Sequence, residues 1–350
     1  MISRIGLNQS DLLCGKRQKA GLSCPSRADT IPVYKFLVNV MSSAVLSSIL
    51  PVCLLMLLGA ALRRFGFLPD LFFAQLNRLG FWILLPSLLF CTIQRAPQAA
   101  SGDGIRVGLL LCACSLAVTA AAWLAARAMR LPGASARALM QAAMRGNLAY
   151  TALPVILYAF GENSRMAAVA TFALAPAIPF YNFWAVVILT SAPTDTARGS
   201  RRVRALFAVL RNPLIIGCLL GALAWKSGVP LPQGILNAVT ALGNAALPCA
   251  LLALGAGLTP ARLRAQFRPA LVGTALKLLL MPAFGYLFAC AAGFNRELTL
   301  VALLFLASPC AVTSYVMADQ MGADKELAGS AIVLSTLLCL PVMAVLLLVF

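Results

Sequence analysis

Runs of apolar residues long enough to cross a lipid bilayer follow one another through most of this sequence. Of its 350 residues, 61% are hydrophobic and only 11% are charged, whereas about 25% of the residues of a typical soluble domain are charged. A helix needs about 20 apolar residues to cross the hydrocarbon core. The sequence therefore predicts an all-α integral membrane protein.

Ten such runs are predicted to form transmembrane helices, separated by stretches rich in proline, glycine and arginine. Residues 1–40 carry more charge and lack the pattern of a signal peptide. They are predicted to be a disordered tail, or an extension upstream of a working start at Met41. The ten predicted spans are 44–62, 71–93, 106–126, 137–160, 167–190, 205–225, 233–257, 269–291, 297–318 and 327–349.

The net charge of +18 lies mostly in the loops that follow odd-numbered spans, as in the pair Arg63 and Arg64 and in the stretch from Arg198 to Arg204. Short basic loops stay in the cytoplasm, so both termini are predicted to lie outside. The positive charge therefore determines how the chain is oriented in the membrane, and no nucleic-acid partner is expected.

The chain has no histidine, and its 11 cysteines are scattered through apolar segments. Histidine-based triads, proton relays and metal sites are thereby excluded. No cluster of acidic residues stands in for them, so we expect no catalytic residue, no metal and no cofactor, and the chain is not predicted to be an enzyme.

The two halves of the sequence resemble each other at a constant offset of 162 residues. Five spans in each half require the second copy to be inverted in the membrane, as in many secondary transporters. The predicted organisation is a first repeat at 41–190, a cytoplasmic linker at 191–204 and a second repeat at 205–350. The matching positions are Pro51 with Pro213, Gly59 with Gly221, Gly66 with Gly228, and Leu85-Pro86 with Leu247-Pro248.

Spans four and nine each contain a proline in their middle, Pro154 and Pro309. A proline removes one helical hydrogen bond, and the freed backbone groups are tolerated in a membrane only where they face protein or a cavity. Two broken helices at corresponding places of two repeats indicate the substrate site of a transporter.

Polar side chains near the two breaks are the candidate ligands, although each has a simpler explanation. The Asn147 amide could bind a neighbouring helix, and Arg145 or Lys277 could extend to the membrane surface. Hydroxyl groups could bind carbonyls of their own helix. Tyr181 and Asn182 of span five are weaker candidates. The predicted substrate-binding residues are Arg145, Asn147, Pro154, Lys277, Pro309, Thr313 and Ser314.

Several motifs of the two interrupted spans and their neighbours are typical of one family: Arg145-Gly146-Asn147, Leu153-Pro154, Gly161, Asn212-Pro213, and Pro309 followed by Thr313-Ser314-Tyr315-Val316 and Ser335-Thr336-Leu337. Through them, residues 41–350 resemble the auxin efflux carrier family, in its bacterial branch, which implies a bacterial inner membrane. The resemblance also implies ten helices, of which spans 1, 2, 6 and 7 form a scaffold and a homodimer surface. The other six form a moving transport domain with crossing broken helices. Implied substrates are acids such as auxin, malate or malonate, with Asn147 at the carboxylate, carried by elevator-like alternating access.

Two other functions remain open at this stage. A sodium-coupled carrier of the bile-acid-transporter type would share the crossing architecture, but the spans contain no deep acidic residue. A membrane sensor would need a soluble output domain, which the hydropathy pattern does not indicate. The identity of the substrate, the direction of transport and the coupling ion are not predicted.

Overall fold

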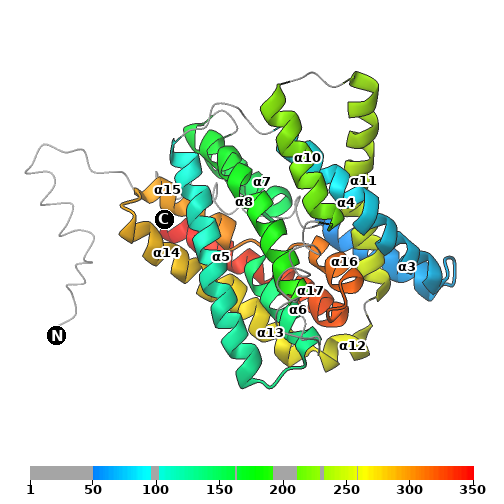
Figure 1. Ribbon diagram of the computed structural model, residues 1–350. Helices are drawn as coiled ribbons and strands as arrows, with labels where there is room; N and C mark the ends of the chain where they lie inside the picture. Colours follow the sequence, from blue (N-terminus) through cyan, green and yellow to red (C-terminus); the bar gives the residue numbers. More distant parts are fainter. Residues whose placement is uncertain (1–49, 96–101, 162–163, 192–210, 229–231, 258) are drawn as a thin grey trace, which may run out of the picture. The chain divides into compact units, whose positions relative to one another are not determined.

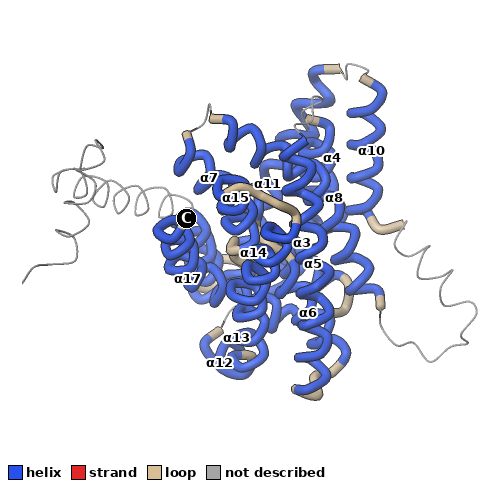
Figure 2. The backbone as a smooth tube through the Cα atoms, turned by 90° about the vertical axis from the view of Figure 1, so that its left-hand side faces the viewer, coloured by secondary structure: helices blue, strands red, loops and turns tan. Residues whose placement is uncertain are grey.

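The computed structural model describes residues 50–95, 102–161, 164–191, 211–228, 232–257 and 259–350. Every regular element in these ranges is helical (Figures 1 and 2), which confirms the predicted all-α class. The predicted tail at 1–40 lies outside the described residues, as does the linker at 191–204 apart from Ser191.

The helices follow the predicted order of spans. A helix with described residues 50–64 comes first. After it come α3 (Asp70–Leu79), the π-helical turn η1 (Gly80–Leu84), α4 (Leu85–Gln94), α5 (Gly102–Ala128), α6 (Gly133–Met144), η2 (Leu148–Ala152), α7 (Leu153–Phe160) and α8 (Arg165–Thr190). The second half contains α10 (Pro213–Ser227), α11 (Gln233–Gly257), α12 (Pro260–Ala265), α13 (Phe267–Ala275), η3 (Leu276–Leu280), α14 (Met281–Ala291), α15 (Arg296–Leu306), α16 (Thr313–Gln320) and α17 (Lys325–Val349).

Within the described residues, six helical segments are long and apolar enough to cross a membrane. Two shorter apolar helices, Leu148–Phe160 and Pro213–Ser227, accompany them. Each of the ten predicted spans overlaps one of these segments, the helix at 50–64, or a pair of shorter helices. The six segments are Asp70–Gln94, Gly102–Ala128, Arg165–Thr190, Gln233–Gly257, Phe267–Ala291 and Lys325–Val349.

Polar residues placed just before the apolar runs begin several of these helices. The side chains of Ser164, Asn212, Asn295 and Asp324 each accept a hydrogen bond from a backbone N–H of the first turn. Such caps satisfy donors that have no partner inside the helix, so the sequence itself fixes where α8, α10, α15 and α17 start.

The two predicted breaks occur, but the two prolines act differently. Pro309 lies in the non-helical stretch between α15 and α16. Pro154, by contrast, is in the first turn of α7, and the first break lies before it, between Met144 and Leu148. The prediction that Pro154 itself interrupts span four is therefore wrong, since the helix resumes at Leu148, before this proline.

A widened turn explains why Pro154 does not break its helix. The π-helical turns η1, η2 and η3 each lie directly before a helix whose second residue is a proline: Pro86, Pro154 and Pro282. A proline ring clashes with the carbonyl four residues earlier, and a π-type turn moves that carbonyl away. These prolines therefore widen the helix without ending it.

The described helices pack as two groups. The wall group consists of the helix at 50–64, α3, η1, α4, α10 and α11; α4 and α10 lie side by side in Figures 1 and 2. The crossing group consists of α5 to α8, α13 to α17, η2 and η3, with α5 packed along α8. Contacts within each group are more extensive than those between the groups.

Two glycine contacts in the wall group are related by the sequence offset. A side chain on Gly59 would collide with the backbone of Leu252 in α11, and one on Gly221 would collide with the backbone of Phe90 in α4. Gly59 and Gly221 are 162 residues apart, and so are Phe90 and Leu252. The same close helix contact is thus made twice, with the roles of the two halves exchanged.

Candidate functional site

The two breaks meet in a short backbone pairing. Gly146 and Cys310 form an isolated antiparallel bridge. The N–H of Asn147 donates to the carbonyl of Pro309 at 2.8 Å, and the N–H of Ala311 donates to the carbonyl of Arg145 at 3.1 Å. Polar backbone groups that the breaks release are therefore partnered inside the protein, as the interior of a membrane requires.

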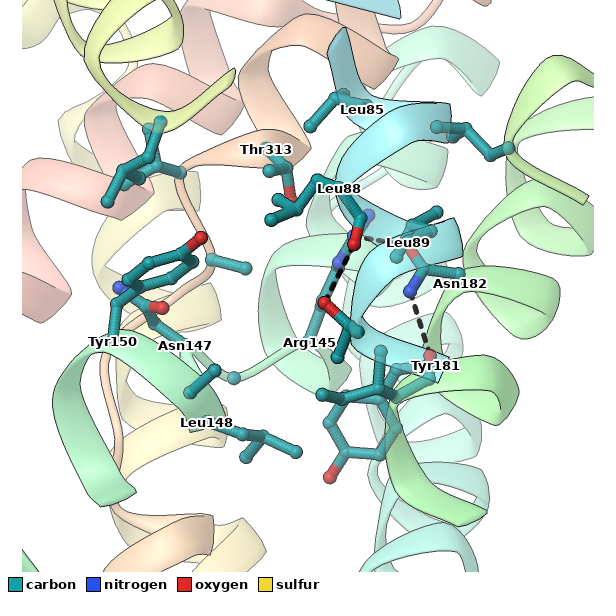
Figure 3. A pocket seen from close by; sticks show the side chains of 18 residues that line it. Leu85, Leu88, Leu89, Arg145, Asn147, Leu148, Tyr150, Tyr181, Asn182 and Thr313 are labelled. Carbon is teal, nitrogen blue, oxygen red and sulfur yellow. Dashed lines mark hydrogen bonds between the residues drawn. The ribbon is translucent and has the colours of Figure 1, made fainter. Parts of the chain in front are cut away.

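A cavity of about 100 Å³ lies beside this crossing, between the wall group and the crossing group (Figure 3). The wall group contributes an almost entirely apolar face, made of Leu85, Leu88, Leu89, Thr92, Leu214 and Leu247. The crossing group contributes the polar face and the backbone of both breaks, from Arg145, Gly146, Asn147, Leu148, Ala149, Tyr150, Ile178, Tyr181, Asn182, Ala311, Val312 and Thr313.

Arg145 lines the cavity and is 6% exposed, which excludes the alternative in which it extends to the membrane surface. Its Nη2 donates to Oδ1 of Asn182 at 2.6 Å, and its Nη1 donates to the sulfur of Met317. None of the ion pairs found in the described residues includes Arg145. The cavity thus contains a buried positive charge held by neutral groups.

Lys277 is fully buried in η3, so it does not extend to the surface either. Its Nζ donates to the carbonyl of Leu306 at 2.9 Å, at the last residue of α15, and lies 3.1 Å from the sulfur of Met281. It does not line the cavity but lies behind Gly146, where a Cβ would be 2.9 Å from Nζ. This second cation therefore sits at the negative end of a helix dipole.

Asn147 lines the cavity with its side chain 7% exposed. Its amide makes no hydrogen bond with any residue that the structure describes, so the alternative of an interhelical bond is not observed. Figure 3 shows Asn147 and Tyr150 on one side of the cavity, with Arg145 and Asn182 on the other. An amide that is nearly buried and lacks a partner is free to bind a ligand.

The first residues of two helices also face the cavity. After the first break, the first N–H that donates a helical hydrogen bond is that of Thr151, to the carbonyl of Asn147. After the second break, it is that of Ser314, to the carbonyl of Ala311. The N–H groups before these bonds have no hydrogen-bond partner in the described ranges. Such groups, at the positive end of a helix, bind anions. They belong to Leu148, Ala149, Tyr150, Val312 and Thr313, all of which line the cavity.

The remaining predicted site residues do not line the cavity. Ser314 is fully buried, and Pro154 follows η2, while Pro309 provides the carbonyl that Asn147 binds. The structure thus brings Arg145, Asn147 and Thr313 together around the cavity. Tyr150 was not predicted, although it lies only three residues after Asn147.

The contact of Met317 with Arg145 was not predicted either, because nothing in the sequence distinguishes this methionine from other apolar residues of its helix. Only its contacts with Arg145 and with the amide of Gln141, 3.6 Å from its sulfur, show that role.

The fold and the cavity define a class: a multi-pass helical membrane protein with a buried, positively charged cavity where two interrupted helices cross. The chain belongs to the membrane transport protein family, the auxin efflux carriers, whose family model matches residues 44–347. The family predicted from the sequence is thereby confirmed.

Relatives of similar length carry transporter names. An "Uncharacterized transporter" of Methanothermobacter thermautotrophicus is 27% identical over 84% of this chain and 94% of its own length. A "Putative malonate transporter" of Rhizobium meliloti is 27% identical over 83% of this chain and 91% of its own length. An "Uncharacterized transporter" of Methanocaldococcus jannaschii is 24% identical over 85% of this chain and 96% of its own length.

Proposed function

We propose that this protein is a secondary transporter of small organic anions, carboxylates such as malate, malonate or auxin-like acids. The observation that carries the proposal is the buried guanidinium of Arg145, which faces a cavity and pairs with no acid in the described part of the chain. A buried charge is costly unless it is paired. An anionic substrate supplies the missing partner.

The other cavity groups fit the same ligand. A carboxylate has two oxygens that accept hydrogen bonds, and the unpartnered N–H groups of Leu148, Ala149 and Tyr150 are suitable donors. Asn147 adds a side-chain donor, and the guanidinium of Arg145 can bind a carboxylate through two parallel bonds. The malonate in the name of the Rhizobium meliloti relative supports a small carboxylate.

The distribution of these groups supports elevator-like alternating access. Every charged or amide side chain of the cavity belongs to the crossing group, and the wall group offers five leucines and Thr92. Movement of the crossing group along this apolar wall would carry the substrate without breaking its polar contacts. Because an apolar surface makes no directional bonds, such sliding costs little.

We also propose that the ten helical segments form two inverted five-helix repeats. The exchanged contacts Gly59–Leu252 and Gly221–Phe90 support an internal two-fold relation. So do Gly66 and Gly228, which are 162 residues apart and both have positive φ. The bacterial inner membrane, both termini outside, and a homodimer belong to the same proposal.

Sodium coupling is not part of the proposal. In this structure the ammonium of Lys277 already binds the carbonyl of Leu306 at the end of α15, so the crossing contains its own cation. Uptake is therefore expected to be independent of sodium.

The first experiment is a thermal-shift panel on purified protein with acetate, malonate, malate and indole-3-acetate, followed by uptake of the most stabilising acid into proteoliposomes. Asn147→Ala is expected to lower both binding and uptake. Asn237→Ala, at an exposed position of α11, is the matched control and should behave as wild type. If none of the four acids stabilises the protein or enters the vesicles, the proposal is wrong.

A further inference from the structure

The side-chain amide of Asn182 in α8 makes two hydrogen bonds, one of them with Arg145. Its Oδ1 accepts from Nη2 of Arg145 at 2.6 Å, and its Nδ2 donates to the carbonyl of Ile178 at 2.8 Å. The side chain is 3% exposed and lines the cavity. Both ends of the amide are therefore in use, and its orientation is fixed.

We infer that Asn182 is a positioning residue that holds the guanidinium of Arg145 in place while leaving its positive charge free for the substrate. The inference rests on the proposed function and extends it. Arg145 supplies the charge that attracts an anion, and Asn182, a neutral residue that need not touch the substrate, keeps that charge available.

The guanidinium has donors left over in this arrangement. An arginine side chain has five N–H donors, and its observed contacts are with Asn182 and the sulfur of Met317. Both partners are uncharged, so they orient the group without neutralising it. A carboxylate ligand then meets a pre-positioned cation, which lowers the entropy lost on binding.

The need for an amide follows from the two neighbours of Asn182. The carbonyl of Ile178 faces Nδ2, where only a donor is favourable, while Arg145 requires an acceptor. An aspartate would accept from Arg145 but would repel the carbonyl, and its charge would pair with the guanidinium. Such an internal ion pair would occupy the positive charge that the substrate needs.

The test compares Asn182→Asp and Asn182→Leu with wild type, using the acid of the four-member panel that stabilises wild type most. At neutral pH, Asn182→Asp is expected to weaken binding at least about tenfold. Asn182→Leu no longer holds the guanidinium but adds no competing charge, so its affinity should lie between those of wild type and Asn182→Asp. A role in packing alone would give the reverse order, since aspartate is closer to asparagine in shape than leucine is.

Asn237→Asp is the matched control, since it places a carboxylate on an exposed helix position outside the cavity. Size-exclusion profiles of the variants show whether each is folded. If folded Asn182→Asp binds with wild-type affinity, or binds at least as well as folded Asn182→Leu, the assignment of Asn182 is overturned while the transport proposal stands. Lack of binding by wild type would overturn both.

Discussion

Gly146 and Cys310 lie opposite each other in an antiparallel bridge, which joins the two interrupted helices where they cross. Two backbone hydrogen bonds flank this bridge: the N–H of Asn147 donates to the carbonyl of Pro309, and the N–H of Ala311 donates to the carbonyl of Arg145. The hydrocarbon core contains no water to bind the free backbone groups of a broken helix. The N–H and C=O groups of each break therefore bind those of the other. The crossing is thus a backbone structure, and the cavity residues depend on it for their positions.

Substitution of Gly146 is expected to disturb the crossing directly. A Cβ there would collide with the hydroxyl of Ser308 and approach Nζ of Lys277, and overpacking of this kind costs about 1–3 kcal/mol. Gly146→Ala should therefore lower the melting temperature and the uptake rate. Gly234→Ala, at a helical position with open space around it, should leave both unchanged or raise the melting temperature slightly. Equal behaviour of the two variants would contradict this account.

Lys277 offers a test in which stability and transport change in different directions. Lys277→Met removes a buried charge, which relieves a desolvation cost, although it leaves the carbonyl of Leu306 without its donor. We expect the melting temperature to stay equal or rise while uptake falls about tenfold or more, because the positive potential behind the cavity is lost. Scanning calorimetry and proteoliposome uptake on the same preparation measure both quantities. Unchanged uptake would show that the charge of Lys277 has no part in transport.

Much of this architecture could be predicted from the sequence because membranes allow so few solutions. Apolar runs of sufficient length located the helices, and the prolines located spans four and nine as the interrupted ones. The exact place of the first break could not be predicted, since Pro154 is accommodated by η2 and the break lies at Gly146.

The environments of the two cations were beyond sequence reasoning for a related reason. Position along a span does not tell which way a long side chain turns, so Arg145 and Lys277 could equally have reached the surface. Their burial depends on Asn182, Met317 and the carbonyl of Leu306. These partners come from other helices, and only the tertiary structure brings them together.

Contacts between the two helix groups should control the conformational equilibrium. Asn77 of α3 donates to Asp319 of α16 at 3.0 Å, and this bond must break if the groups slide. Asn77→Ala should therefore shift the equilibrium constant between this conformation and the other about fivefold away from this one, the value of one hydrogen bond of about 1 kcal/mol, without changing substrate affinity within either conformation.

Spin labels on α3 and α17 in a cysteine-depleted protein would report this shift as a second distance population. Asp103→Asn is the control, since its partner Arg165 belongs to the same group. A single unchanged distance in Asn77→Ala would mean that this bond does not hold the groups in place.

Arg145 provides the most direct test of the anion site. Arg145→Gln keeps a hydrogen-bonding side chain but removes the charge, so binding of any carboxylate should weaken by about a hundredfold, the scale of a charged hydrogen bond of 1.5–3 kcal/mol. Arg145→Lys keeps the charge but loses the planar fork that Asn182 and Met317 hold. It should therefore bind with intermediate affinity and discriminate less well between carboxylates of different shape. Calorimetric titration with malonate and acetate would separate these outcomes. If Arg145→Gln bound both acids as wild type does, the positive charge would have no part in substrate binding, and Asn147 with the unpartnered N–H groups at the starts of η2 and α16 would have to account for it.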